Sequence, residues 1–339
     1  MKLNNILPAL MLLAIVYAVT ITEDTIERGT INLDVGDLVV APGVYYSIIN
    51  NALTTIVGSL NVGAGSGFYV SSTTSLIGLT IALAGVINNI RNDGTIAFNS
   101  LRSLTAPTYQ LAGASFVNNG QMYLGGDGSN ATPVMSITSL LWTNNGFLSF
   151  YQNTRSGGVV TLGAVLPITN AGQICLFKEA YVQTTAINGA GCITVGEDST
   201  VWIQNSLLAV SEDQTIYLES PSSAIRVEAL SLSQTFEVAG YGNGNLIGLS
   251  LPLNLDTILL DPFRYDARTG VLTLISGIFT QNFQIGTGYT PSLFEVVNAN
   301  YGGLITTVLR GGVVYNGPIP AGSTPAANCR DCQPFPDAP

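Results

Sequence analysis

The 339-residue sequence contains no histidine, and only 9% of its residues are charged. The absence of histidine excludes Ser-His-Asp and Cys-His nucleophile systems and every His-ligated metal site. The shortage of Lys and Glu argues against amphipathic helices, whose solvent faces need such side chains. The 11 basic residues are scattered among 21 acidic ones, giving a formal net charge of −10. Nucleic acid is therefore excluded as a partner, because phosphate contacts require clustered Lys and Arg.

The residues that are abundant favour strands. Hydrophobic residues make up 47% of the chain, 37 residues are glycine, and Asn, Ser and Thr are frequent. This composition is too apolar for a disordered chain, and its β-branched residues and glycines disfavour helices. We predict an all-β protein.

The first residues predict export. Residues 1–18 have the features of a signal peptide: Lys2 precedes an apolar run, and Val16 and Ala18 are small residues at the cleavage positions. In an exported chain, four cysteines indicate two disulfides rather than metal or redox chemistry. The sequon Asn130-Ala131-Thr132 predicts N-glycosylation at Asn130, with an unused sequon on a polar loop as the alternative.

Four similar segments recur at a fixed interval. They read NDGTIAF, NNGQMYL, NNGFLSF and NAGQICL, and their glycines, at positions 94, 120, 146 and 172, are 26 residues apart. A fixed period in this range is typical of solenoids. Asn-Gly alone would also fit four independent hairpins in a β-sandwich, but hairpins do not explain the equal spacing.

Apolar residues follow the same interval and form three columns. The columns are Ile90, Phe116, Trp142 and Ile168; Ile96, Met122, Leu148 and Ile174; and Phe98, Leu124, Phe150 and Leu176. Parallel strands stacked about 4.8 Å apart would place like residues over like. We therefore predict a parallel, right-handed β-helix of about 26-residue coils over residues 19–213. Its corners should need φ > 0 at Asn and Gly, and the asparagines should form hydrogen-bonded ladders.

The remaining chain has a different pattern. From residue 214 to 316 the segments TIYLES, AIRVEAL, TFEVAGYG and FRYDARTGVLTLIS alternate without a fixed period, which predicts a smaller antiparallel β-rich module. Residues 317–339 are Pro-rich and predict an extended exit segment.

The alignment of the coils indicates which cysteines are close enough to form disulfides. Cys175 and Cys192 point outward on one face, with Cys192 opposite Gln173 and therefore two residues out of register with Cys175. Their Cα atoms would be roughly 8 Å apart, beyond disulfide reach. This favours bonding each of them to one of Cys329 and Cys332. A one-residue slip would instead allow Cys175–Cys192 with Cys329–Cys332.

No catalytic constellation is found in the sequence. Many parallel β-helices are polysaccharide lyases or hydrolases, whose sites need clustered carboxylates. Asp93 occupies a corner position, and the pairs Glu197-Asp198 and Glu212-Asp213 fit solvated loops better than calcium ligands. We expect no catalytic residues, no metal and no cofactor.

Aromatic residues offer a candidate binding surface. Tyr123 and Phe147 point outward on neighbouring coils, and Tyr151, Tyr181 and Trp202 could extend their area. Exposed rings beside amides and hydroxyls suit sugar stacking or peptide contact. Alternatively, these rings lie beneath a covering loop.

The order of motifs resembles one known family. ITEDTIERGTINL, GVYYSIIN, the NNG-type coils, paired cysteines and a closing YNGPIPAG and CRDC resemble the N-terminal domain of the hyphally regulated cell-wall (Hyr/Iff-like) family of yeast GPI-anchored adhesins. The resemblance covers nearly the whole mature chain. It implies a β-solenoid effector domain followed by a smaller β-rich module. In full-length members it also implies a Ser/Thr-rich stalk and a GPI remnant linked to cell-wall glucan.

Together these features predict a secreted, non-enzymatic adhesin domain at the cell wall. Its expected partners are a host-surface protein or glycan, another cell, or an abiotic surface. The alternative is a β-helix protein that binds or cleaves polysaccharide.

Overall fold

The computed structural model describes residues 18–339 except 30–33, 84, 86, 206, 231, 258–259, 302–306 and 326. Strands dominate this part of the chain, and the only helical elements described are the 3-10 turns η1 (Pro291–Leu293) and η2 (Ala321–Ser323), so the all-β prediction is confirmed. The predicted signal peptide lies almost entirely outside the described residues. Within them, no helix has the length and apolar character needed to cross a membrane.

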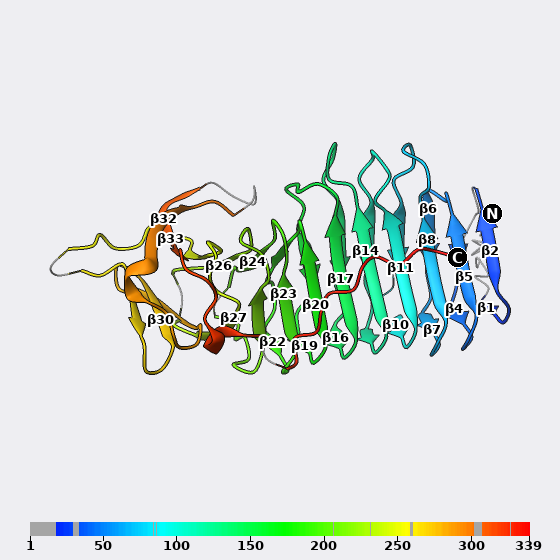
Figure 1. The fold of residues 1–339 in the computed structure, drawn as a ribbon. Helices are drawn as coiled ribbons and strands as arrows, with labels where there is room; N and C mark the ends of the chain where they lie inside the picture. The colour runs from blue at the N-terminus through cyan, green and yellow to red at the C-terminus, as the bar shows by residue number, and fades with distance from the viewer. Residues whose placement is uncertain are drawn as a thin grey trace, which may run out of the picture.

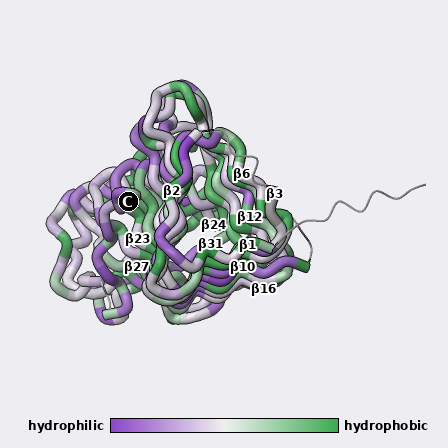
Figure 2. The backbone as a smooth tube through the Cα atoms, turned by 90° about the vertical axis from the view of Figure 1, so that its right-hand side faces the viewer, coloured by the Kyte–Doolittle hydropathy of each residue, from purple (hydrophilic) through white to green (hydrophobic). Residues whose placement is uncertain are grey.

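The chain winds through three sheets (Figure 1). Each coil up to β22 contributes one strand to each sheet, and the later parallel coils contribute strands to sheets B and C only. Sheet A contains β1 (Val19–Ile21), β4 (Leu38–Val40), β7 (Leu60–Val62), β10 (Asn89–Asn92), β13 (Ser115–Asn118), β16 (Leu141–Asn144), β19 (Ile168–Asn170) and β22 (Ile187–Asn188). Viewed along the axis, the sheets form the sides of the coil, and loops between sheets B and C project between β2 and β6 (Figure 2).

Sheet B begins with β2 (Thr25–Arg28), β5 (Tyr45–Ile49), β8 (Gly67–Ser71), β11 (Thr95–Ser100), β14 (Gln121–Gly126), β17 (Phe147–Gln152), β20 (Gln173–Phe177), β23 (Cys192–Val195), β25 (Thr215–Leu218) and β27 (Thr235–Ala239). Sheet C begins with β3 (Asp34–Val35), β6 (Leu53–Ile56), β9 (Thr80–Leu83), β12 (Thr108–Leu111), β15 (Val134–Ile137), β18 (Val160–Leu162), β21 (Ala180–Val182), β24 (Thr200–Ile203), β26 (Ala224–Val227) and β28 (Leu246–Leu249). All these strands pair in parallel, which confirms the solenoid.

The predicted columns are the core. Ile90, Phe116, Trp142 and Ile168 are direct partners across sheet A, and the other two columns are partners across sheet B. Every member of the three columns is buried. The 26-residue period is thus the distance between stacked residues, and burial of these side chains drives the stacking.

A ladder of buried asparagines connects the coils. Asn92 Nδ2 donates to Asn118 Oδ1 at 2.8 Å, Asn118 to Asn144 at 2.7 Å, and Asn144 to Asn170 at 2.8 Å. Each of the three Nδ2 groups also donates to a backbone carbonyl of the next coil. A second ladder runs beside it in solvent, from Asn145 to Asn119 to Asp93. The predicted ladders are confirmed.

The reason for glycine at these corners differs from the prediction. Gly94, Gly120, Gly146 and Gly172 do not have a positive φ. Instead, a Cβ on Gly120 or Gly146 would lie well inside van der Waals contact with the carbonyl oxygen of the corner glycine one coil earlier. Glycine is required because successive corners pack backbone against backbone.

The parallel stack continues beyond the predicted boundary at residue 213. β25 pairs in parallel with β23, and β26 and β28 continue sheet C. Antiparallel pairing begins with β29 (Phe263–Asp266), β30 (Val271–Ser276), β31 (Phe279–Gln284), β32 (Phe294–Ala299) and β33 (Val308–Tyr315), here called the cap. The predicted antiparallel module is therefore present, but it begins later than residue 214, because period-2 alternation is the same for both pairing directions.

The C-terminal segment returns along the solenoid. It runs from the cap across sheet B to the first coils (Figure 1), where Ser47 Oγ donates to the Pro339 carbonyl oxygen at 3.5 Å. Cys175 is bonded to Cys332 and Cys192 to Cys329, which is the favoured of the two predicted connectivities. Gln173 and Cys192 are strand partners, as the alignment required.

The buried ladder should contribute more to stability than the exposed one. Asn144→Ala leaves the Asn118 amide donor and the Asn170 oxygen without their partner, so we expect a loss of about 2–4 kcal/mol in the free energy of unfolding. The neighbouring Asn145→Ala removes a solvated hydrogen bond and should cost less than about 0.5 kcal/mol. Urea denaturation of both variants tests this, and equal losses would contradict the assigned role.

The two disulfides should differ in what they protect. The Cys175→Ala/Cys332→Ala variant releases residues 333–339 and should uncover the aromatic side chains beneath them, so binding of a hydrophobic dye should rise. The Cys192→Ala/Cys329→Ala variant keeps the Cys332 bond and should bind little additional dye. Each double variant should lose about 2–4 kcal/mol of stability in denaturant titrations. Equal dye binding by both would contradict this arrangement.

Candidate functional site

The predicted aromatic surface on sheet B is covered. Tyr123 and Phe147 stack with ring centroids 5.2 Å apart, but only 3% and 5% of their surfaces are exposed. The C-terminal segment lies over them, with Phe335 5.6 Å from the Tyr123 ring. The alternative interpretation, rings beneath a covering segment, is therefore the one that the structure supports for these two residues.

The other three candidates do not join them. Tyr181 faces the core of sheet C, where its partners Val160 and Val201 are also buried. Tyr151 is partly buried against Phe177, at 5.6 Å between centroids. Trp202 lies on the outer side of sheet C, and no described contact links it to the rings of sheet B. The five aromatics therefore do not form one exposed site.

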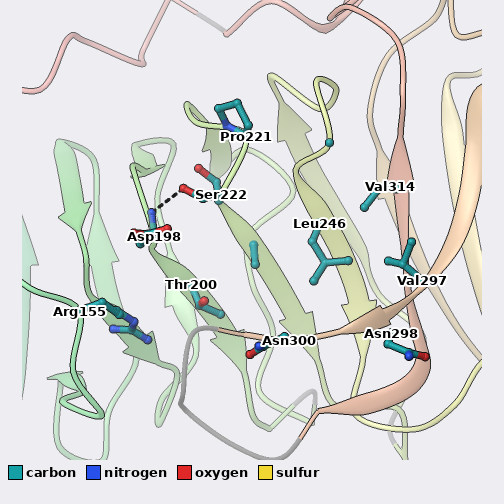
Figure 3. Close-up of a pocket in the computed structure, with 13 residues that line it drawn as sticks. Arg155, Asp198, Thr200, Pro221, Ser222, Leu246, Val297, Asn298, Asn300 and Val314 are labelled. Atoms are coloured by element: carbon teal, nitrogen blue, oxygen red, sulfur yellow. Dashed lines mark hydrogen bonds between the residues drawn. The ribbon is translucent and has the colours of Figure 1, made fainter.

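The structure instead shows a groove of about 410 Å³ where the cap meets the solenoid (Figure 3). Its floor is one register line across sheet C: Thr200, Ala224, Leu246 and Val314 are successive strand partners on β24, β26, β28 and β33. Three of these four side chains present methyl groups alone. Stacking thus produces a largely apolar floor from residues that lie far apart in the sequence.

Two walls of polar residues border this floor. One wall is the row of turns between sheets B and C, which contributes Arg155, Asp198, Pro221, Ser222 and Gly244. The Asp198 backbone N–H donates to Ser222 Oγ at 2.8 Å (Figure 3), which ties two successive turns together. The other wall is the end of β32 and the residues after it, with Val297, Asn298 and Asn300.

An aromatic–cation stack holds the second wall over the sheet. The Arg226 guanidinium carbon lies 4.7 Å from the Trp202 ring centroid and 5.3 Å from that of Tyr301. Tyr301 Oη also donates to the Leu249 carbonyl oxygen at 3.3 Å. Cation–π contacts of this kind strengthen when they are desolvated, and Arg226 is buried.

Gly248 makes this close approach possible. A Cβ at this position would collide with the Tyr301 hydroxyl group, so the ring can lie against the sheet only where glycine interrupts the outer face. A glycine inside the strand LIGL was the available sequence signal for this feature. Sequence reasoning did not use it, because the partner is more than fifty residues away.

A buried carboxyl group lies near the Arg155 wall. Glu179 is fully buried, and burial raises its pKa to about 8, although a hydrogen bond from Gln152 and the charge of Arg155 act in the opposite direction. The ordinary Glu value is 4.5, so this carboxyl group binds a proton well into the neutral range.

The lining residues of the groove determine which chemistry it can support. Asp198 is the single carboxylate among its lining residues. Glycoside hydrolysis normally uses two carboxyl groups that flank the scissile bond. Among the described residues, no group of three or more Cys, Asp or Glu side chains is arranged to hold a metal ion. Hydroxyl, amide and guanidinium groups around an apolar floor can hold a polar chain without transforming it.

Asn130 lies in the exposed loop after β14, between sheets B and C. Its side chain amide contacts Ser129 Oγ at 3.3 Å, and the two other residues of the sequon are exposed as well. The position is accessible to modification, and its glycosylation stays a prediction.

These features define a class: a disulfide-clamped β-solenoid domain with an antiparallel cap and a ligand-sized groove. Residues 9–339 match the family model described as "Hyphally regulated cell wall protein N-terminal". The chain belongs to this family, in agreement with the resemblance in its motifs, and membership assigns it to the cell wall.

Curated relatives of the chain include proteins of Candida albicans. The chain is 48% identical to cell wall protein RBR3, and the match covers 97% of this chain and 21% of the relative. It is 45% identical to cell wall protein IFF9, with 99% of this chain and 36% of the relative covered. The identity to hyphally regulated cell wall protein 3 is 44%, and the match covers 97% of this chain and 26% of that protein. The chain thus spans about a fifth to a third of these relatives. Their names describe cell wall proteins and no enzyme.

The raised pKa of Glu179 predicts how stability depends on pH. A carboxyl group with a higher pKa in the folded than in the unfolded state stabilises below its unfolded pKa, and the contribution is lost as pH rises through the folded pKa. The free energy of unfolding should therefore fall between pH 4.5 and about 8. Glu179→Gln should flatten this dependence in denaturation curves. The exposed Glu197→Gln serves as control and should leave the slope unchanged, and an unchanged slope in Glu179→Gln would contradict the assignment.

Proposed function

We propose that this chain is the non-enzymatic adhesive domain of a fungal cell-wall protein and that the groove between solenoid and cap holds its ligand. The observation that carries the proposal is the groove itself, a largely apolar floor between two largely polar walls, the second of which is held by the Trp202–Arg226–Tyr301 stack. A binding site of this kind is largely preformed, so that little ordering cost accompanies binding.

The chemistry of the walls favours a polar chain as ligand. Ser222 and Asn300 can exchange hydrogen bonds with hydroxyl or amide groups, and Arg155 and Asp198 supply one charge of each sign. The Thr200 hydroxyl group is buried and donates to the Tyr301 carbonyl oxygen at 3.3 Å, so it helps to hold the wall. An extended glycan or peptide from a host surface or another cell fits this combination. Attachment to abiotic surfaces would use the outside of the solenoid in addition.

The proposed setting follows from the family. The signal peptide over residues 1–18 would direct export. In the full-length protein, a stalk and a C-terminal GPI remnant linked to cell-wall glucan would display the domain. The greater length of the relatives supports this setting, because in each of them most of the chain lies outside the region matched here.

A polysaccharide-cleaving function is the second candidate. Many parallel β-helices cleave polysaccharides, which favours this function. The groove, however, offers one carboxylate where glycoside hydrolysis normally requires a pair. A reducing-sugar assay on the purified domain distinguishes polysaccharide cleavage from non-enzymatic adhesion, because turnover of any polysaccharide would overturn the proposal of a non-enzymatic domain.

Blocking the groove should abolish attachment. Ser222→Trp places a large ring on the exposed wall and should lower adhesion of domain-coated beads to epithelial cells at least about tenfold, since the ligand loses access to the floor. Binding to a glycan array should fall in parallel if the ligand is a sugar.

The matched control is Ser129→Trp, an exposed serine on another turn between the same two sheets. It should leave adhesion unchanged. If both variants adhere like the unmodified domain, the ligand does not use the groove.

A further inference from the structure

One side of the solenoid carries almost no charge. We define the "neutral face" as the outer side of six strands of sheet A together with the segments that join sheet C to sheet A between residues 57 and 209. The six strands are β7, β10, β13, β16, β19 and β22. In the sequence of these strands and segments, Arg91 is the only charged residue. It forms an ion pair with the neighbouring Asp93 at 2.7 Å. The net charge of −10 therefore resides elsewhere.

The neutral face also exposes large aliphatic side chains along its corner with sheet C. Ile87, Val165 and Leu207 are 81%, 80% and 72% exposed, and Leu140 and Leu141 project from the same corner. The corner segments stack on one another: the Leu141 N–H donates to the Ala114 carbonyl oxygen at 2.9 Å, and the Ile187 N–H to that of Ala209 at 2.9 Å. Figure 2 shows this corner between β12 of sheet C and β10 and β16 of sheet A.

The size of the corner residues follows a symmetric order. Large side chains at Ile87, at Leu140–Leu141, at Val165–Leu166 and at Leu207 are interrupted by small ones at 112–114 and 184–186. The order along the axis is therefore large, small, large, large, small, large. From Ile87 to Leu207 it is the same in both directions, and the segment of Val57, which is 39% exposed, precedes it at the end of the face.

We propose that the neutral face pairs with the same face of a second copy of this chain, with the two solenoid axes antiparallel. A two-fold axis through the coil of Leu141 would set Ile87 and Val165 of each copy against the small corners at 184–186 and 112–114 of the other. Leu207 would then face the segment of Val57. Isologous contacts of this kind are closed and self-complementary. We assign a second copy as the partner of this face because two acidic copies repel each other least where their contacting surfaces carry no net charge.

The size of the face sets the strength of the pairing. Seven coils at about 4.8 Å span roughly 29 Å, and the strands with their corner are about 20 Å wide, so each copy offers about 600 Å². Stable interfaces bury about 800 Å² per partner. The pair should therefore be weak and reversible. Copies crowded on one wall would pair at such an affinity.

The test measures the oligomeric state of the purified domain. Sedimentation equilibrium should show a monomer–dimer equilibrium that persists in high salt, because the contact is apolar. The Leu141→Lys/Val165→Lys variant should weaken it at least about tenfold, since each dimer would bury unpaired ammonium groups. The control Leu76→Lys/Ile278→Lys changes two similarly exposed residues outside the neutral face and should dimerise like the unmodified domain.

Cross-linking tests whether the two solenoid axes of the dimer are antiparallel. Thr143→Cys lies on the outer side of β16 near the proposed axis and should cross-link to itself with a short bis-maleimide, whereas Asn61→Cys on β7 should not. A domain that stays monomeric at a concentration of about 1 mM would overturn the proposal. So would equal weakening by the control variant, or efficient cross-linking through Asn61→Cys. Groove variants such as Ser222→Trp should leave dimerisation unchanged, so that the two proposals can fail separately.

Discussion

The structure depends on the contact between successive corners of the coil. At Gly120 and Gly146 the backbone packs directly on the carbonyl group of the coil before, and beside it Asn118 donates to Asn144 at 2.7 Å. Both amide hydrogens of the buried asparagine are used, one along the ladder and one on the backbone. This leaves a single register, because a slip would strand buried polar groups and drive apolar columns outward. The floor of the groove and the order of the corner residues both depend on that register.

A parallel stack has open ends, and the fold closes one of them by reversing strand direction. The end of β32 leads the chain over the outer side of sheet C, and β33 then pairs antiparallel with both β28 and β32. Tyr301 can lie on the sheet because residue 248 is glycine, and Arg226 is held between two rings. Protection of the exposed edge and formation of the groove are therefore results of the same structural step.

The returning C-terminal segment determines which surfaces remain available. It covers the aromatic strip of Tyr123 and Phe147 on sheet B and is fixed there by two disulfides. Two surfaces of different chemistry stay open: the groove on sheet C, with polar walls, and the neutral face on sheet A. A domain displayed on a wall could thus hold a ligand on one side and a neighbouring copy on another.

The sequence by itself determined the all-β class, the 26-residue coil, the core columns and the buried ladder, because each depends on neighbours at a fixed interval in the chain. It also indicated that Cys175 and Cys192 are two residues out of register. Only the tertiary structure decided where parallel pairing ends, since strands such as TIYL alternate equally in either direction. It alone showed that Tyr123 is covered, that Tyr181 points inward, and that Thr200, Ala224 and Leu246 are successive strand partners. Those relations join segments tens to hundreds of residues apart, and no local pattern records which distant segment will cover a given side chain.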